Sequence, residues 1–543
     1  MEANRDGDDA RARAREENER IANEESERVL DDAAPLLGGP ASASRANAMG
    51  KREFFGQPLA LVPLGATEAW ERFGYYAARA LLATYAHARL RDPNFDVERV
   101  WGARTLAKAC TGYDFGVPVD ANDVGALRVR DAAATSASAR LYGTFAAASY
   151  LMPVFGGVIS DAMLGAHRSA VIGSMVMAVG YAGMATEWAF LLGMLAVCVG
   201  NGAFKPSMST QLSALYDASD PRRDAGFSIF YCCINVGAFF SPLIAGTVRV
   251  YFGYGAAFAS AAVGMCCALV IYASNRKLVK EATVTKDRER GIDRNDDDEE
   301  FGGATLEDDE VSREEPHDGF GAKLKEMSRV VQRNPSALLA VGVICAAGVG
   351  FSVVYEQQGS TVMLFSDEHV DLNGLPTEFV AALNPLFVLI FTPAVTRLWD
   401  WQDRRDAEPH QMTKFAIGCA LLATSFVVLM FGALPIDSHA SPKRVSVLWI
   451  VLNQILLTVG ELFSMPVALS YVSKVAPHGL LSAVIGLWFG SSFFGNYFSG
   501  ILGSAYPEFS TPSAFFAALA AIAGGVAVLL LLVSAPLRRA ALS

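Results

Sequence analysis

Charged residues are scarce in this sequence. Asp, Glu, Lys and Arg make up 19% of its 543 residues, whereas about 25% is usual for a soluble globular domain. The net charge is -11, so the excess of basic residues that favours nucleic-acid binding is missing, and no such partner is expected. Of the eight cysteines, only Cys110 lies in a polar stretch. The others lie in apolar segments, which favours packing roles over a disulfide framework.

Several catalytic and nucleotide-binding motifs are also missing. No G-x-x-x-x-G-K-[ST] phosphate loop occurs, which argues against an ATP-driven pump. Neither an H-E-x-x-H nor a G-x-S-x-G pattern occurs, and the seven histidines fall in loops or at the ends of apolar segments. These absences argue against an integral membrane enzyme, and we expect no metal or organic cofactor.

Long apolar segments are abundant instead. Hydrophobic residues make up 52% of the chain, and the mean hydropathy is +0.28. Twelve segments have the about 20 residues needed to cross a bilayer, at 58–87, 138–160, 166–186, 188–214, 224–250, 255–274, 336–364, 376–398, 412–434, 445–473, 479–505 and 511–535. Six precede and six follow a charged segment that contains "DRNDDDEE". The sequence therefore predicts an all-α membrane protein with twelve transmembrane helices in two six-helix bundles.

These segments divide the chain into five predicted regions. They are a disordered acidic tail at 1–57, a first bundle at 58–274, a charged linker at 275–335, a second bundle at 336–536 and a short C-terminus at 537–543. The linker has many charges and few aromatic residues, which predicts a solvated, largely disordered tether.

The basic residues of the short loops predict the orientation. Arg222, Arg404, Lys474 and others fall on one side, which the positive-inside rule makes cytoplasmic. The loop between the first two segments is basic and lies on the other side, but at roughly 50 residues it is near the length where that rule weakens. Both termini and the linker are therefore predicted to be cytoplasmic.

A loop motif follows the second apolar segment. In "GGVISDAMLGAHRS", Asp161 lies between two glycines and Arg168 follows. The motif resembles the major facilitator loop, with one residue more than the common spacing, in which an acid and a base latch neighbouring helix ends. A tight turn alone would explain the glycines but not Asp161, so both residues are predicted to take part in gating. Six helices on each side of a cytoplasmic linker is also the major facilitator arrangement, in which two bundles rock around a midplane site.

The first apolar segment carries charges where a bilayer span should have none. Each charge near the bilayer centre costs roughly 2.5–3.5 kcal/mol on insertion scales, yet "EAWERFGYYAAR" holds four. On a helix of about 3.6 residues per turn, Glu68, Arg72, Tyr76 and Arg79 share one face, and Glu71 lies beside it. This stripe is expected to face a protein interior or an aqueous cleft and not lipid.

Three more ionisable residues lie in the middle of other segments. They are Lys205, Glu356 and Glu461, with Asn235 and Asn384 at similar depths. Structural ion pairs that pin helices together are the plain alternative. Charges that converge from the first, fourth, seventh and tenth segments favour function, and a near-neutral cluster of both signs suits a zwitterionic ligand.

At these residues the chain is similar to the proton-coupled oligopeptide transporter family of the major facilitator superfamily. Glu68, Glu71 and Arg72 reproduce its E-x-x-E-R motif. The segments "FSIFYCCINVGAF", "FKPSMS", "EQQGS", "NPLF" and "GELFSMPVALSYVSKVAP" also match the family, and the resemblance covers residues 58 to about 535. It implies a proton-coupled symporter of di- and tripeptides that works by alternating access. The partners it implies are small peptides, protons and the lipid bilayer.

The resemblance also implies how the substrate is held. The peptide carboxylate would meet Arg72 and Lys205, with Arg79 and Tyr76 nearby. The peptide amino group would meet Glu461, with Asn235 and Asn384. Trp488 would line a side-chain pocket, with a packing or interfacial role as the alternative.

Proton coupling is assigned to a second set by the same resemblance. Glu68 and Glu71 would pair with Lys205 and Arg72. Glu356 would carry the coupling proton and, when ionised, would pair across the cleft with Arg72.

Other substrates and another class of protein stay open. Met465 precedes Pro466 where the family commonly has Ser, and Ser464 is displaced by about 100° around the helix, which leaves the fine substrate contacts open. Nitrate or another small organic anion is the rival substrate, although such an anion gives Glu461 no cation to bind. A nutrient receptor that binds without transport is the rival class.

The membrane that holds the protein is also left open. "DDAAPLLGG" contains Asp32, Leu36 and Leu37 in the D-x-x-x-L-L form of an acidic dileucine sorting signal. Such short patterns often occur by chance, so a vacuolar or endolysosomal membrane and the cell membrane are equal alternatives.

Overall fold

The first described residues form a two-stranded hairpin, in which β1 (Glu53–Phe54) pairs antiparallel with β2 (Gln57–Pro58). The computed structural model describes residues 53–217, 220–289, 335–437, 444–476 and 480–541. The sorting signal at Asp32, Leu36 and Leu37 lies outside these residues, as does most of the predicted tail and linker. Among the described residues, those from Ala60 onward belong to one compact unit, and residues 53–59 lie outside it.

The first half of the chain folds into long helices because a bilayer span must satisfy its own backbone hydrogen bonds. These helices are α3 (Leu61–Arg91), α5 (Val124–Ile159), α6 (Gly165–Met184), α7 (Phe190–Ala214) and α8 (Arg223–Glu289). α8 breaks at Gly253, whose φ of 83° favours glycine. Two short helices, η1 (Val97–Arg99) and α4 (Ala103–Thr111), lie between α3 and α5, and the π-helix η2 (Ser160–Leu164) joins α5 to α6.

The second half begins with a broken helix. α10 (Pro335–Tyr355) passes through the 3-10 turn η3 (Glu356–Gly359) into α11 (Thr361–His369). The helices that follow are α12 (Phe379–Asp403), α13 (Gln411–Asp437), α14 (Leu448–Val475), α15 (Leu481–Ser504), η4 (Tyr506–Glu508) and α16 (Pro512–Ala541). A parallel two-residue pairing of β3 (Val370–Asp371) with β4 (Val445–Ser446) ties two loops together.

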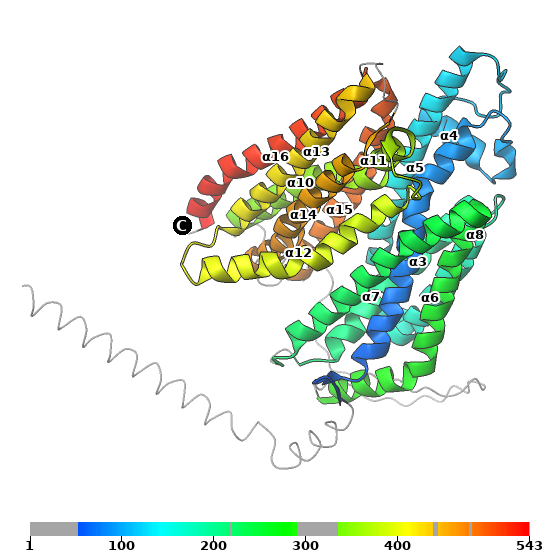
Figure 1. Ribbon diagram of the computed structural model, residues 1–543. Coiled ribbons are helices and arrows are strands. Elements are labelled where there is room, and N and C mark those ends of the chain that lie inside the picture. The colour runs from blue at the N-terminus through cyan, green and yellow to red at the C-terminus, as the bar shows by residue number, and fades with distance from the viewer. Residues whose placement is uncertain (1–52, 218–219, 290–334, 438–443, 477–479, 542–543) are drawn as a thin grey trace, which may run out of the picture. The chain divides into compact units, whose positions relative to one another are not determined.

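These helices confirm the predicted all-α architecture. With α8 divided at Gly253 and α10 to α11 taken as one, the described residues contain six long helices on each side of residues 290–334. Figure 1 shows the two groups, α3 to α8 and α10 to α16, and each has its own hydrophobic core. Among the described residues, eight helices are long and apolar enough to cross a membrane.

Three helix boundaries differ most from the sequence-based ones. α5 begins at Val124 and not near 138, α8 continues to Glu289 beyond 274, and α16 continues to Ala541 beyond 535. Hydropathy marks the part of a helix inside the bilayer, and residues such as Lys, Arg, Glu and Ala extend the same helix into water because they are good helix formers. The first residues of the predicted linker therefore belong to α8.

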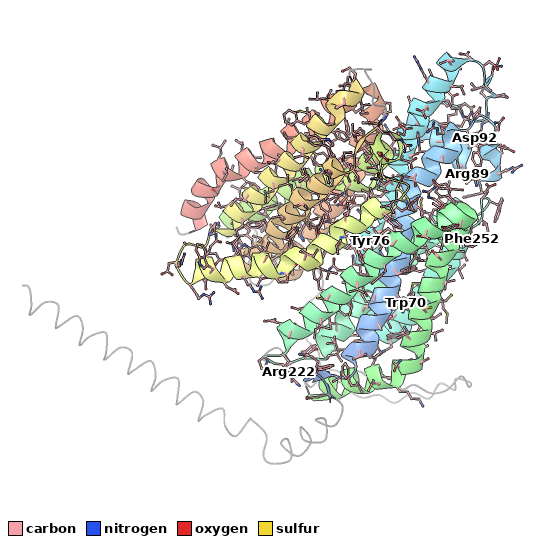
Figure 2. All side chains as sticks on the ribbon, in the orientation of Figure 1. Trp70, Tyr76, Arg89, Asp92, Arg222 and Phe252 are labelled. Carbon is pink, nitrogen blue, oxygen red and sulfur yellow. The ribbon has the colours of Figure 1, made fainter. Side chains whose placement is uncertain are left out.

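The two bundles contact each other at one end, here called the far end, where α3 finishes and α8 turns at Gly253. Figure 2 labels Arg89, Asp92 and Phe252 at this end of the first bundle and Arg222 at the opposite end. Arg91 of α3 lies 3.1 Å from Glu368 of α11, and Arg249 of α8 lies 2.5 Å from Glu378 beside α12. The far end is therefore closed by ion pairs between the bundles.

Small residues allow a closer approach of α5 to α15 near the same end. A Cβ atom on Gly143 would lie 2.5 Å from the Cα of Gly500, so the two backbones can meet only because both residues are glycines. The Ser136 hydroxyl donates to the Ser504 carbonyl at 2.7 Å. This crossing adds direct backbone packing to the far-end contact.

Candidate functional site

The charged stripe of α3 faces the protein interior, as its helical spacing predicts. Glu68, Glu71 and Arg72 are each at most 6% exposed. The Arg72 guanidinium forms ion pairs with both carboxylates, 3.3 Å from Glu68 and in direct contact with Glu71. It also lies 3.5 Å from the Asn201 amide oxygen on α7. The motif therefore places two acids and one base in a single buried cluster.

Lys205 on α7 does not join that cluster as an ion-pair partner. Its ammonium group lies 5.2 Å from the ring centroid of Tyr150 on α5, a cation–π contact. No ion pair of Lys205 occurs among the described residues. The expected pairing of Glu68 and Glu71 with Arg72 is confirmed, whereas the expected ion pair with Lys205 does not form among the described residues. The Lys205 charge is thus left for another anionic group.

Arg79 lies two helical turns beyond Arg72 and connects the two bundles. Its guanidinium forms an ion pair with Glu356 of η3, and its Nε donates to the Tyr142 hydroxyl on α5 at 2.6 Å. The Tyr142 hydroxyl also donates to the Glu356 carboxylate at 3.2 Å. Arg79 and not Arg72 is therefore the partner of Glu356, and the expected Arg72–Glu356 pair is wrong.

The turn at Glu356 follows from the approach of Tyr142. A Cβ atom on Gly359 would lie 1.9 Å from the Tyr142 hydroxyl, so glycine is required at the last position of η3, just before α11. The break leaves Glu356 at the first position of the 3-10 turn. The segment "EQQGS" thus positions an acid of the second bundle against a base and a phenol of the first.

Glu461 and Asn384 meet within the second bundle, as expected. The Asn384 amide on α12 donates to the Glu461 carboxylate on α14 at 2.9 Å, and it lies 3.1 Å from the Thr458 hydroxyl. Asn235 on α8 is buried and donates to the Tyr231 carbonyl of its own helix at 3.0 Å. The contacts of the described residues therefore group Asn384, but not Asn235, with Glu461.

The remaining predicted site residues are Trp488, Tyr76, Asp161 and Arg168. Trp488 is 4% exposed and packs on α10, where a Cβ atom on Gly348 would lie 2.8 Å from its ring. Trp488 is therefore in the packing role that was the alternative to a side-chain pocket.

Tyr76 lies on the charged stripe, and the Arg79 guanidinium is 5.9 Å from its ring centroid. Asp161 belongs to η2 and Arg168 to α6, but the side chain of Asp161 lies outside the description, so the latch stays a prediction.

Sequence reasoning missed Tyr142, Tyr150 and Asn201. Each is one of several polar residues in its apolar segment, a signal too common to distinguish packing from function. The family segment "EQQGS" identifies Glu356 but not Tyr142, its hydrogen-bond partner in the first bundle.

Known proteins are similar to this chain over most of its length. A model described as PTR2, POT family, matches residues 163–290 and 319–524. The peptide transporter YePEPT of Yersinia enterocolitica is 28% identical over 541 residues, with 91% of this chain and 97% of that protein covered. Dipeptide and tripeptide permease A of Escherichia coli is 27% identical over 477 residues, which cover 82% and 85% of the two chains. A crystal structure of peptide transporter POT in complex with sulfate has the same fold, with a TM-score of 0.68, 24% identity and 90% and 96% coverage.

Proposed function

The chain belongs to the POT family, and from this premise we propose that it is a proton-coupled symporter of di- and tripeptides that works by alternating access. The family match makes it an integral membrane transporter and not an enzyme. The relatives named as peptide, or dipeptide and tripeptide, transporters support a peptide substrate.

The distribution of charge between the bundles supports a zwitterionic substrate. The first bundle supplies Lys205, which has an aromatic contact but no ion pair among the described residues, together with the guanidinium of Arg79. The second bundle supplies Glu461, held by Asn384. A peptide carboxylate suits Lys205 and Arg79, and a peptide amino group suits Glu461. The displaced Ser464 donates its hydroxyl to the Gly460 carbonyl of its own helix and packs against Gly418 of α13, so its hydroxyl is already occupied within the second bundle.

The contact of Arg79, Tyr142 and Glu356 is the observation that carries the coupling proposal. It is a buried ion pair between bundles, and protonation of Glu356 removes its charge. Alternating access requires contacts between bundles that break and re-form. A proton on Glu356 would therefore weaken one closing contact and leave Arg79 for the substrate carboxylate.

Uptake into liposomes that contain the purified protein tests the proposal. We expect labelled dipeptides to accumulate when an inward pH gradient is imposed and to equilibrate without accumulation when it is absent. Nitrate or a small organic acid should not accumulate under the same gradient. Accumulation of the anion alone would contradict the peptide assignment, and peptide binding without flux would indicate a receptor.

The same proposal places both termini in the cytoplasm and leaves sorting to the N-terminal tail. If Asp32, Leu36 and Leu37 form a sorting signal, replacing Leu36 and Leu37 with Ala should move a fluorescent fusion from internal membranes to the cell surface. Leu30→Ala, a leucine of the same tail outside the motif, is the matched control. A fusion that keeps its distribution after the double replacement would show that the pattern has no sorting role.

A further inference from the structure

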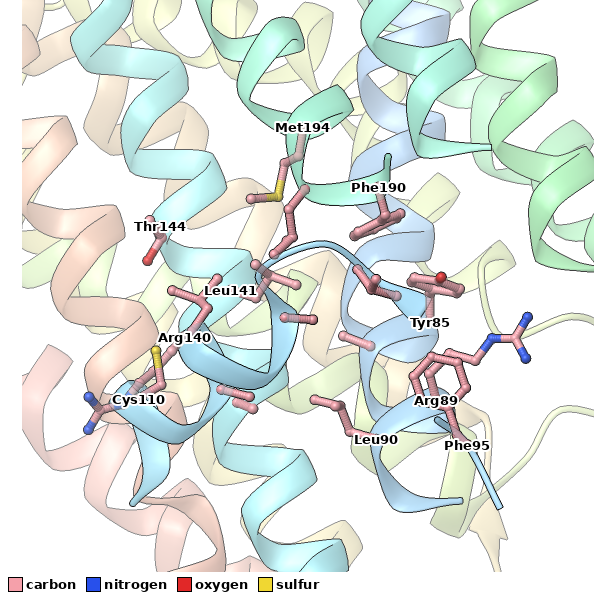
Figure 3. A pocket seen from close by; sticks show the side chains of 17 residues that line it. Tyr85, Arg89, Leu90, Phe95, Cys110, Arg140, Leu141, Thr144, Phe190 and Met194 are labelled. Atoms are coloured by element: carbon pink, nitrogen blue, oxygen red, sulfur yellow. The ribbon is translucent and has the colours of Figure 1, made fainter. Parts of the chain in front are cut away.

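A pocket lies at the far end of the first bundle, away from the charged stripe. It is a cavity of about 100 Å³ between α3, α4, α5 and the start of α7. Figure 3 shows its lining, in which apolar side chains surround the space. They include Tyr85, Leu90, Leu106, Leu141, Phe190 and Met194. Because the lining is apolar, water has few partners there, and a hydrocarbon chain is the better occupant.

The amphipathic helix α4 covers one side of this pocket. Ala103, Leu106 and Ala107, at helical spacing, line the cavity. Outside the cavity, Arg104 donates to Asp114 at 2.7 and 3.0 Å. The Arg104 guanidinium holds the pKa of the Asp114 carboxyl well below its usual value. The ion pair between Arg104 and Asp114 therefore persists at neutral and mildly acidic pH and fixes the loop after α4.

Two exposed tryptophans place the pocket near the membrane surface. Trp101, just before α4, is 55% exposed, and Trp188, just before α7, is 63% exposed. The Trp101 backbone N–H donates to the Trp188 carbonyl at 3.1 Å. Exposed tryptophans of membrane proteins gather at the level of the lipid headgroups. Leu106 and Thr144 line the pocket and are exposed as well, so the cavity reaches the protein surface.

A positively charged side chain, that of Arg140, lies at the edge of the pocket. Arg140 lies next to Cys110 in Figure 3, and its Nε donates to the neutral Ser504 hydroxyl of α15 at 3.0 Å. No acid forms an ion pair with Arg140 among the described residues, whereas Arg89, the other arginine of the pocket, lies 2.9 Å from Glu187. The pocket therefore combines an apolar interior with a guanidinium whose charge has no counter-ion in the described part of the chain.

We propose that this pocket binds an anionic phospholipid, with a short segment of one acyl chain in the cavity and the phosphate against Arg140. The apolar lining supplies the affinity for the chain, and charge-assisted hydrogen bonds from the guanidinium select an anionic headgroup. Because Arg140 also contacts Ser504, the lipid would lie beside the crossing of α5 and α15 that closes the far end.

Photo-crosslinking in nanodiscs tests this site. Wild-type protein is placed in bilayers that contain phosphatidylglycerol or phosphatidylcholine with a diazirine on one acyl chain, and adducts are mapped by mass spectrometry. We expect phosphatidylglycerol adducts to concentrate in residues 103–111 and 137–144. Arg140→Gln should lower them roughly fivefold, to the yield given by phosphatidylcholine, and the exposed Arg128→Gln at the same end should leave them unchanged.

Variants that fill the cavity test the binding of the acyl chain independently of the binding of the headgroup. Leu141→Trp and, as a smaller change, Ala107→Leu should each reduce the adducts of both lipids in these two segments while retaining dipeptide uptake. Adducts spread evenly over the lipid-facing helices would overturn the proposal. An unchanged preference for phosphatidylglycerol in Arg140→Gln would overturn the role of Arg140.

Discussion

Glu356→Gln is expected to abolish peptide accumulation driven by a proton gradient and to leave peptide-for-peptide exchange intact. The carboxylate of Glu356 forms an ion pair with Arg79 and accepts a hydrogen bond from Tyr142. Glutamine has nearly the same shape but carries no charge and binds no proton. The variant should therefore behave as a permanently protonated transporter whose binding site still works.

The size of the effect follows from linkage. A proton and a peptide are coupled only if both favour the same conformation. A proton that crosses with the membrane field gains about 2.3 kcal/mol per 100 mV, which is enough for roughly fiftyfold accumulation of a neutral peptide. Without a proton site, this gain is lost, and the internal peptide concentration should only reach the external one.

Reconstituted liposomes allow both activities to be measured on the same protein. Accumulation is followed under an imposed pH gradient and potential, and exchange is followed by counterflow with internal unlabelled peptide. Glu368→Gln is the matched control, because Glu368 also pairs with an arginine across the bundles, at 3.1 Å, but is 30% exposed and lies at the rim of the far end. Proton-driven accumulation that persists in Glu356→Gln would remove Glu356 from coupling and leave Glu68 or Glu71 as the next candidate.

The features set by the bilayer were the ones that the sequence predicted well. Twelve apolar segments correspond to the long helices because membrane spans must be continuous hydrogen-bonded helices of a fixed minimum length. The buried position of Glu68 and Arg72 follows from the same constraint, since charges on one helical face cannot point at lipid. Helical spacing also places Glu68 within reach of Arg72 on the same helix, as observed.

The contacts between segments were less predictable. Helical spacing gives the face on which a residue lies, but not the height at which one bundle meets the other. Arg72 and Arg79 share a face of α3 about two turns apart, so the sequence alone did not decide which one meets Glu356. The close approach of Tyr142 to Gly359 decides it. Trp488 could not be placed for the same reason, since its packing on Gly348 depends on how α15 lies on α10.

A second large effect is expected when the amino group of the peptide is removed as a partner of Glu461. The Glu461 carboxylate lies 2.9 Å from the Asn384 amide, and no ion pair with a protein cation occurs for Glu461 among the described residues. Removing one partner of a desolvated charge pair typically costs 2–5 kcal/mol or more, so N-acetylation of a dipeptide should weaken binding to the wild type about thirtyfold or more.

The same acetylation should have a much smaller effect on Glu461→Gln, because the variant has already lost the charge that the amino group would meet. We expect the free peptide to bind the variant weakly and the acetylated peptide to bind within about fivefold of it, a coupling that a double-mutant cycle isolates. Equilibrium binding of labelled peptide to detergent-purified protein measures the four affinities. Glu508→Gln, an exposed acid of the second bundle, should keep the full wild-type penalty. If acetylation weakens binding equally in the wild type and in Glu461→Gln, Glu461 does not bind the amino group, and the buried carboxylates of Glu68 and Glu71 on α3 are the next acids to test against it.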